Sequence, residues 1–187
     1  MFLETHSAVP VDYLLENLET FQKDFWWLRD NDMFYDYTED MDDVLWNRKQ
    51  TGHFWQLSAF FYNKDLLQNL PEGVADLETV KIIQSLPVKP ILGTFSIMEP
   101  HSILDWHEGH DEHCIAGRKD TYVIKYHIGI DVADNDLAGL NVGEATGILK
   151  NGKLHVFNEG MQHWAYNDSD HRRGVLILSF LACDLGV

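Results

Sequence analysis

The chain has 187 residues, of which 45% are hydrophobic, and 30 acidic side chains stand against 14 basic ones, giving a net charge of −16. A chain of this length normally forms one domain with a sizeable core, so fibrous and disordered classes are excluded. Nucleic acids and anionic membranes attract proteins mainly through Lys and Arg, and the acidic balance therefore argues against both as partners. Two widely spaced cysteines, a start unlike a signal peptide and the lack of an apolar run of about 20 residues predict a cytoplasmic protein without membrane insertion.

Helical patterns lie in the first ninety residues. Hydrophobic residues recur at spacings of three and four from Pro10 to about residue 29, which predicts one amphipathic helix with Pro10 in its first turn. A second helical pattern covers residues 77–86 and ends at two prolines. Between them, residues 30–43 are acidic and aromatic without a regular period, which is typical of a solvated loop with aromatic anchors; a substrate-facing loop is the alternative. Residues 52–62 are aromatic and β-prone.

From residue 91 onward the pattern changes to short strands separated by Gly, Asn, Asp and His clusters. The Asn151-Gly152 pair between two β-prone segments predicts a β-hairpin, because both residues tolerate positive φ. So many short strands favour a sandwich or jelly roll over a parallel sheet. We expect a single domain, 1–187, in which a helical and aromatic part, 1–90, packs on a jelly-roll core, 91–187. The predicted strands are 91–98, 121–130, 145–150, 153–157 and 175–181.

Histidines are the most conspicuous candidates for chemistry, since the chain has ten. The segment 106–113, WHEGHDEH, fits neither the HExxH pattern of zincins nor the HxxEH pattern of inverzincins, and Gly109 weakens a helix there. We therefore expect a loop or a strand end. His110 and His113 are equally compatible with a solvated surface loop and with metal binding.

A period of two in residues 121–130 places Lys125 and His127 on one face of a strand and apolar side chains on the other. This pattern fits either the wall of a polar pocket or an exposed strand face. His163, taken alone, is more typical of a packing residue than of a ligand. An arginine at the head of an apolar strand, as at Arg172 or Arg173, needs an anion if it points into the interior.

Six short motifs follow one another in the second half of the chain: FSIMEP at 95–100, DWHEG at 105–109, KYHIG at 125–129, NGKLHVF at 151–157, QHWAYN at 162–167, and Arg173. Ser96 lies 11 residues before His107, and Arg173 lies 10 residues after His163. In this order and these spacings, the chain from Phe95 to about Leu181 resembles the aspartyl/asparaginyl β-hydroxylase family of iron(II)- and 2-oxoglutarate-dependent dioxygenases.

The resemblance implies a mainly β protein with N-terminal helices, whose core is a double-stranded β-helix of jelly-roll or cupin-like form. It also implies that His107 and His163 bind Fe(II) and that Arg173 pairs with the distal carboxylate of the cosubstrate 2-oxoglutarate. These three residues are then the catalytic set. Two protein ligands suit this chemistry, because the metal must keep positions open for a chelating keto acid and for O2.

The resemblance further implies that Ser96 and His127 donate hydrogen bonds to 2-oxoglutarate. Lys125 stands where the family has an arginine and keeps its role in binding the cosubstrate, although its ammonium cannot supply the bidentate fork of a guanidinium. The stretch that follows His107, residues 109–121, is longer than in the family and is compatible with a lid over the site.

Gly109 occupies the position at which many dioxygenases of the superfamily carry a third iron ligand, a carboxylate two residues after the first histidine. The family that this chain resembles shares the glycine, which favours water at that position. Glu108 is a poor ligand, because the neighbour of a ligand on a strand points away from the metal. Asp111, returning through a turn, or a halide would also fill the position.

The function that the resemblance implies is hydroxylation of a C–H bond in a small-molecule, amino-acid or peptide substrate. A halogenase-like oxidation at the same centre is one alternative, and a non-catalytic jelly-roll binding module is another. Catalysis requires His107, His163 and Arg173 together, whereas a binding module does not.

Overall fold

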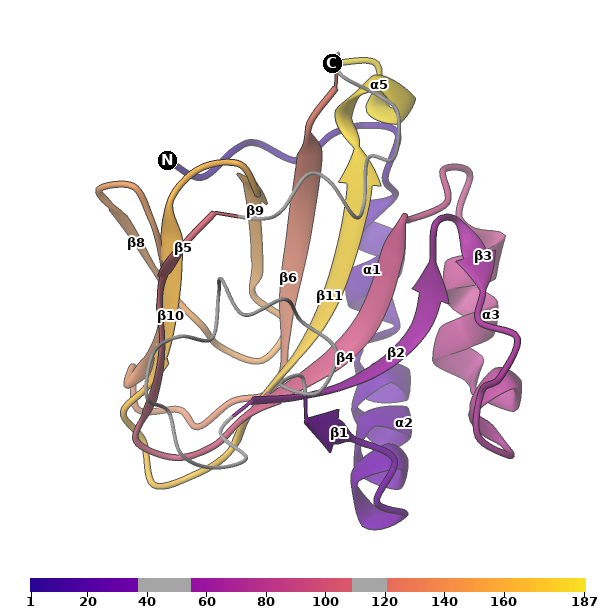
Figure 1. Ribbon diagram of the computed structural model, residues 1–187, viewed down its shortest axis with the longest axis horizontal. Helices are drawn as coiled ribbons and strands as arrows, with labels where there is room; N and C mark the ends of the chain where they lie inside the picture. The colour runs from indigo at the N-terminus through magenta and orange to yellow at the C-terminus, as the bar shows by residue number, and fades with distance from the viewer. Residues whose placement is uncertain (37–54, 109–120) are drawn as a thin grey trace.

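The computed structural model describes residues 1–36, 55–108 and 121–187. Two antiparallel β-sheets face each other, and the long helices cover the outer face of the larger sheet (Figure 1). The helical elements are α1 (Val11–Glu16), α2 (Leu18–Asp30), the 3-10 turn η2 (Val74–Asp76), α3 (Glu78–Ser85) and α5 (Ala182–Leu185). The strands are β1 (Tyr35–Asp36), β2 (Trp55–Tyr62), β3 (Asp65–Leu66), β4 (Leu92–Met98), β5 (Ser102–His107), β6 (Val123–Asp131), β7 (Ala138–Val142), β8 (Ala145–Ile148), β9 (Leu154–Asn158), β10 (His163–Asn167) and β11 (Arg173–Leu181).

The larger sheet has the order β1-β2-β4-β11-β6-β9, with β3 paired to β2, and the smaller sheet has the order β5-β10-β7-β8. Every pairing between these strands is antiparallel. Two packed antiparallel sheets with strands that cross between them form a jelly roll, so the predicted fold class is confirmed. The first ninety residues contribute strands as well as helices, because β2 pairs along its length with β4.

Side-chain alternation gives the larger sheet two different faces. On β6, Ile124, Tyr126 and Ile128 belong to the hydrophobic core under the helices. Lys125 and His127 point to the opposite face, toward the smaller sheet, as the period of two predicts. The space between the sheets is therefore where polar side chains of the larger sheet gather.

The helical stretch predicted from Pro10 to residue 29 is present but divided. Pro10 precedes α1, and Asn17 separates α1 from α2 with φ −95° and ψ 15°. The Asn17 side chain donates a hydrogen bond to the carbonyl oxygen of Tyr13 at 2.8 Å. Asparagine competes with the helix for backbone groups in this way, which explains the break in an otherwise continuous apolar pattern. The helix predicted at 77–86 is confirmed as α3.

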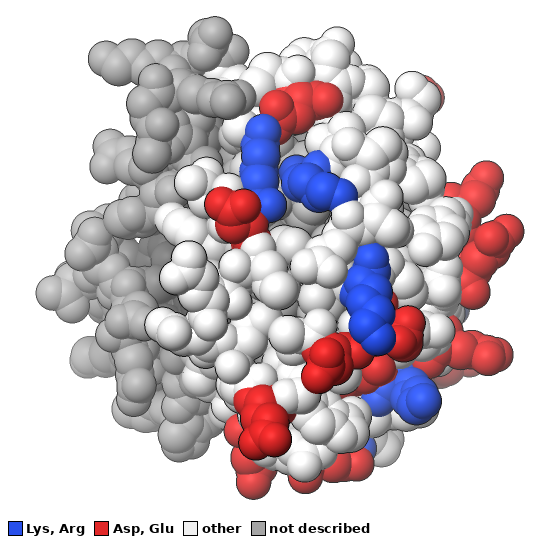
Figure 2. Space-filling model, turned by 90° about the vertical axis from the view of Figure 1, so that its right-hand side faces the viewer, with Lys and Arg blue, Asp and Glu red and all other residues white. Residues whose placement is uncertain are grey.

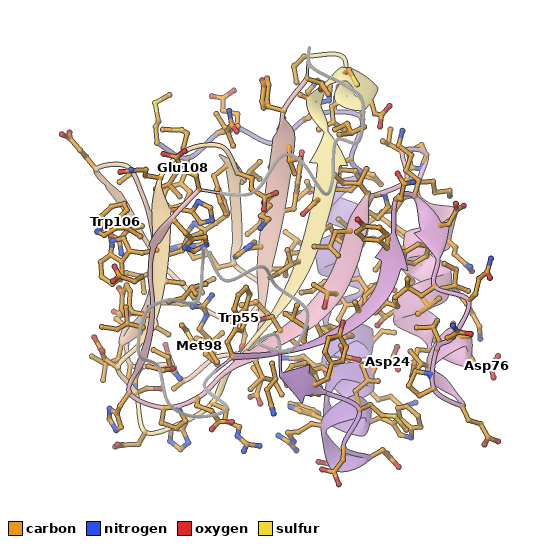
Figure 3. The ribbon with its side chains drawn as sticks, in the orientation of Figure 1. Asp24, Trp55, Asp76, Met98, Trp106 and Glu108 are labelled. Atoms are coloured by element: carbon orange, nitrogen blue, oxygen red, sulfur yellow. The ribbon has the colours of Figure 1, made fainter. Side chains whose placement is uncertain are left out.

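A buried carboxylate joins the two longer helices. Asp24 of α2 accepts a hydrogen bond from the backbone N–H of Thr79 at 2.7 Å, in the first turn of α3 (Figure 3). Unpaired N–H groups at a helix N-terminus favour a negative charge, so the carboxylate satisfies a donor that the helix itself cannot. This contact fixes α3 against α2 on the outer side of the larger sheet.

The hairpin predicted at Asn151-Gly152 is wrong. β8 pairs with β7 in the smaller sheet, whereas β9 pairs with β6 in the larger one. Only Gly152 has positive φ in this turn, +73°, and a two-residue turn that aligns a hairpin of the I′ type needs positive φ at both positions. The turn instead carries the chain from one sheet to the other. Positive φ at both central residues occurs at Asn63-Lys64, between the paired strands β2 and β3.

Four of the five predicted strands of the second half are confirmed with small shifts of their ends, and the fifth, 145–150, is shorter. The predictions did not include β5, β7 and β10, which form most of the smaller sheet. On the face shown in Figure 2, basic side chains lie scattered among acidic ones rather than in one patch. In the described parts of the chain, no helix combines the length and the apolar character needed to cross a membrane.

Candidate functional site

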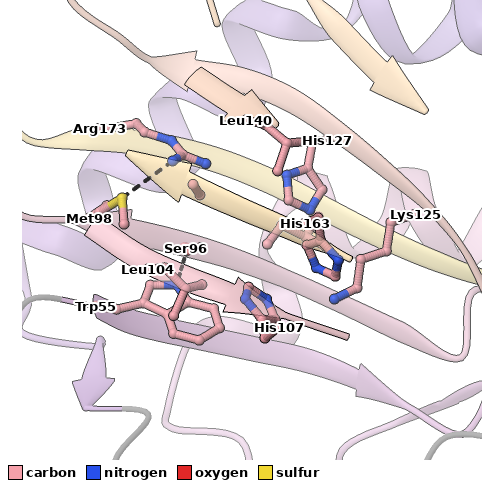
Figure 4. Close-up of a pocket in the computed structure, with 12 residues that line it drawn as sticks. Trp55, Ser96, Met98, Leu104, His107, Lys125, His127, Leu140, His163 and Arg173 are labelled. Atoms are coloured by element: carbon pink, nitrogen blue, oxygen red, sulfur yellow. Dashed lines mark hydrogen bonds between the residues drawn. The ribbon is translucent and has the colours of Figure 1, made fainter. Parts of the chain in front are cut away.

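A pocket opens between the two sheets, with about 430 Å³ of empty space that includes open solvent at its mouth. Trp55 and Met98 lie in this space, whereas Trp106 lies on the outer side of the smaller sheet (Figure 3). Side chains from both sheets line the pocket: Trp55, Ser96, Met98, Leu104, His107, Lys125, His127, Leu140, His163, Ala165, Arg173 and Ile177. Figure 4 shows Arg173 and Met98 at one end and the two histidines of the smaller sheet, with Lys125, toward the other.

Strand pairing brings two histidines together. His107 ends β5, His163 begins β10, and the two are direct partners in the antiparallel register. Their ring centroids are 4.2 Å apart, with an angle of 56° between the ring planes. Bonds between a metal and an imidazole nitrogen are about 2 Å long, so two rings at this separation are close enough to share one ion.

The same local hydrogen bond orients each imidazole. Nδ1 of His107 donates to the carbonyl oxygen of Asp105 at 2.7 Å, and Nδ1 of His163 donates to that of Met161 at 2.7 Å. A carbonyl oxygen can only accept, so Nδ1 carries a proton in both rings, and the neutral form of each ring has its lone pair on Nε2. Burial, together with His107 and Lys125, lowers the pKa of His163 to about 3. His163 is therefore a neutral Nε2 donor at neutral pH, the form in which histidine binds metals.

His127 lies beside this pair on the facing sheet. It is 7% exposed, and neither ring nitrogen has a hydrogen-bond partner within the described parts of the chain. Phe157 packs against the rings of both His127 and His163, at centroid distances of 5.1 and 5.0 Å. Burial, with the nearby cations Lys125 and Arg173, holds the pKa of His127 well below its usual range. A neutral imidazole with unsatisfied nitrogens is thus available to a polar ligand.

Arg173 occupies the other end of the pocket and is 4% exposed. Its Nη1 donates to the sulfur of Met98 at 3.3 Å and to the carbonyl oxygens of Gly139 and Tyr166 at 3.4 Å. Its Nε has no partner, and in the described ranges no carboxylate pairs with the guanidinium. Burial lowers its pKa to about 10, so it stays charged at neutral pH. A buried cation without an acidic partner is the feature that an anionic ligand would complete.

Arg172 points the other way. Its side chain is 53% exposed and lies 2.9 Å from a carboxylate oxygen of Glu99. Neighbouring strand residues face opposite sides, so only Arg173 can face the interior.

Ser96 is buried between the ends of the pocket and receives a hydrogen bond from the indole N–H of Trp55 at 2.6 Å. An indole N–H can only donate, so the hydroxyl accepts here and can donate its own proton to a second group. Trp55 comes from the N-terminal half, and the sequence pattern indicated only that residues 52–62 are β-prone.

Lys125 is paired. Its Nζ lies 2.5 Å from Oε1 of Glu159, and the two side chains are 16% and 13% exposed. The motif KYHIG places this lysine in the pocket, but nothing in the sequence pattern identifies Glu159 as its partner. Glu159 lies in the turn between β9 and β10.

Asn167, fully buried at the end of β10, holds the strand ends at the arginine side together. Its Nδ2 group donates to the carbonyl oxygens of Met98, Glu99 and His171, at 3.1, 3.0 and 2.8 Å. The amide thereby ties β10 to the end of β4 and to the turn that precedes β11.

The structure thus brings all six predicted site residues into one pocket: Ser96, His107, Lys125, His127, His163 and Arg173. The described residues include no cluster of three or more His, Cys, Asp or Glu side chains placed to hold a metal ion. Gly109, His110, Asp111 and His113, and nearly all of the segment 109–121, lie outside the described residues, and Glu108 is exposed.

The residues fit an iron and keto-acid site. The imidazoles of His107 and His163 are oriented as a pair of nitrogen ligands, and the low pKa of His163 keeps that ring neutral. The buried guanidinium of Arg173 can bind a carboxylate at the other end of the same pocket. Ser96 and His127 lie on the larger sheet with unused hydrogen-bonding capacity.

A jelly roll with histidines and a buried arginine between its sheets defines a cupin-like protein with an internal polar site. The model of one family, described as aspartyl/asparaginyl beta-hydroxylase, matches residues 16–182, and the chain belongs to this family of hydroxylating enzymes. No curated protein matches the chain.

Solved structures with some likeness include the plu4264 protein from Photorhabdus luminescens, with 12% identity, a TM-score of 0.43 and coverage of 81% of this chain and 92% of that one. Rru_A2000 from Rhodospirillum rubrum, described as a cupin-2 domain, has 9% identity, a TM-score of 0.43 and coverage of 78% and 67%. A predicted oxalate decarboxylase from Thermotoga maritima has 12% identity, a TM-score of 0.38 and coverage of 68% and 80%. These distant likenesses carry no argument about function.

Proposed function

We propose that the chain is an Fe(II)- and 2-oxoglutarate-dependent dioxygenase that hydroxylates a C–H bond in a small-molecule, amino-acid or peptide substrate. The observation that carries the proposal is one pocket with a cross-strand pair of oriented histidines and, at its other end, a buried arginine without a carboxylate partner among the described residues. Membership of the hydroxylase family supports the same reaction class.

His107 and His163 would hold the iron through Nε2, because backbone carbonyls fix the proton on each Nδ1. When bound, this centre supplies the oxidation of a C–H bond by O2, coupled to conversion of 2-oxoglutarate to succinate and CO2.

The other residues bind and orient the cosubstrate. Arg173 pairs with the distal carboxylate, because its guanidinium is the pocket's cation that lacks an acidic partner within the described ranges. Ser96 donates its hydroxyl proton to a carboxylate oxygen, since its oxygen already accepts from Trp55. Apolar side chains from both sheets, among them Leu104 of β5 and Ile177 of β11, limit water in the pocket and strengthen these polar contacts.

Anaerobic titration with Fe(II) and 2-oxoglutarate tests the proposal. A visible charge-transfer band should appear with the wild-type protein and be absent from His107→Ala and His163→Ala. His101→Asn is the matched control, because His101 is exposed and its backbone is left-handed, a conformation that Asn tolerates. A band that persists in both single variants contradicts the ligand assignment. No band in the wild-type protein supports a non-catalytic binding module instead.

A screen of small molecules, amino acids and peptides for substrate-dependent succinate then identifies the substrate. Hydroxylated product supports the proposal. A chlorinated product formed when chloride is present would move the assignment to the halogenase-like alternative.

A further inference from the structure

Two cations, Lys125 and Arg173, are among the described residues that line the pocket, and they differ in how their charge is balanced. Arg173 lacks an acidic partner in the described parts of the chain, whereas Lys125 is in contact with Glu159 at 2.5 Å. Both members of this ion pair are largely removed from solvent. A buried ion pair is often no more stabilising than apolar side chains of the same volume, so its main consequence here is the charge of the pocket.

A backbone hydrogen bond fixes the turn that carries Glu159. The N–H of Glu159 donates to the carbonyl oxygen of Val123 at 2.9 Å, which anchors the turn to the start of β6. The same turn contains Met161, whose carbonyl oxygen orients His163. Glu159 is therefore held by the segment that orients a predicted iron ligand.

Figure 4 shows the Lys125 ammonium next to His163, at the histidine end of the pocket. In this place the ammonium is close to the position that the keto-acid end of a chelating cosubstrate would take. Because the ammonium is paired with the Glu159 carboxylate, however, the two groups together carry no net charge at this end of the pocket. Among the described residues of the pocket, only Arg173 then offers a full positive charge to a carboxylate.

We infer that Glu159 is a positioning residue that balances the charge of Lys125 beside the cosubstrate and thereby sets the affinity of the pocket for 2-oxoglutarate. This inference rests on the proposed function, because it assumes that a dicarboxylate binds between the histidines and Arg173. According to this inference, Lys125, which stands where the family has an arginine, has its positive charge balanced by Glu159.

Calorimetric titration of 2-oxoglutarate into the protein loaded with Mn(II), a redox-silent substitute for iron, tests the inference. Glu159→Gln removes one negative charge and frees the ammonium, so the affinity should rise by about tenfold. Lys125→Met leaves the carboxylate uncompensated and should weaken binding by a similar factor. The double variant, with the pair removed as a unit, should bind as the wild type does.

Asp136→Asn is the charge-matched control, because Asp136 pairs with Lys150 at 2.9 Å on the surface, away from the pocket residues. Its affinity for 2-oxoglutarate should equal that of the wild type. In turnover assays with iron, Glu159→Gln should lower the KM for 2-oxoglutarate much more than it changes kcat, which a purely structural role would not produce.

Wild-type affinity in both Glu159→Gln and Lys125→Met would overturn the inference. If Glu159→Gln does not fold, wild-type affinity in Lys125→Met alone is sufficient to overturn it. Failure of the proposed function has a different signature, because the wild-type protein would then not bind 2-oxoglutarate at all.

Discussion

Replacing Arg173 by methionine should have opposite effects on stability and on cosubstrate binding. Methionine has a similar length without the charge, and Arg173 already lies against Met98 in an apolar part of the pocket. If Arg173 only supports the fold, this substitution should lower the stability of the protein. If Arg173 instead binds an anion, the substitution should lower the affinity for 2-oxoglutarate.

The magnitude follows from burial. Desolvation lowers the pKa of Arg173 from its ordinary value to about 10, and each tenfold change in acidity constant corresponds to about 1.4 kcal/mol. Holding this charge without an anion therefore costs about 3 kcal/mol. The ligand-free variant should be as stable as the wild type or more stable, by up to about 3 kcal/mol. Truncating one partner of a buried charge pair costs about 2–5 kcal/mol, so 2-oxoglutarate should bind at least about thirtyfold more weakly.

Urea unfolding of the ligand-free protein and calorimetric titration of 2-oxoglutarate measure the two effects separately. Arg172→Met is the control, because it removes a neighbouring exposed guanidinium that pairs with Glu99, and it should change both quantities little. The reasoning is refuted if Arg173→Met destabilises the ligand-free protein by several kcal/mol and binds 2-oxoglutarate as the wild type does.

Two further predictions concern stability. Because burial lowers the pKa of His163 to about 3 from an ordinary 6.5, the unfolded chain binds a proton below pH 6.5 that the folded protein does not. The free energy of unfolding of the metal-free protein should then fall by about 2 kcal/mol between pH 6.5 and 5 from this group, and an equally steep fall in His163→Asn would contradict this. Asn167→Ala removes three hydrogen bonds that join the strand ends and should cost about 3 kcal/mol in urea unfolding, whereas a loss below about 1 kcal/mol would show that the strand ends do not depend on this amide.

Local periodicity predicted those parts of the fold that depend on one face of one element. The alternation in β6 placed Lys125 and His127 opposite the apolar core, and α3 was predicted from its helical spacing. The turn at Asn151-Gly152 was predicted as a hairpin because turn residues do not specify which sheet the next strand joins. The strands β5 and β10 carry polar residues that face the pocket or solvent, and β7 has only five residues, so their patterns are weak.

In the candidate site, too, local motifs predicted some residues, whereas contacts between distant segments were not predictable. Motif order and spacing placed His107, His163 and Arg173, which the structure brings into one pocket. The contributions of Trp55 and Glu159 could not be predicted, because each depends on a contact between segments far apart in sequence or on the path of a turn. Spacing along the chain carries no information about such partners.

A crystal structure of the anaerobic complex with Fe(II) and 2-oxoglutarate tests the central claim most directly. The account predicts one iron bonded to Nε2 of His107 and of His163, with the distal carboxylate of 2-oxoglutarate on the guanidinium of Arg173. Iron bound by other side chains, or a distal carboxylate turned away from Arg173, would contradict it.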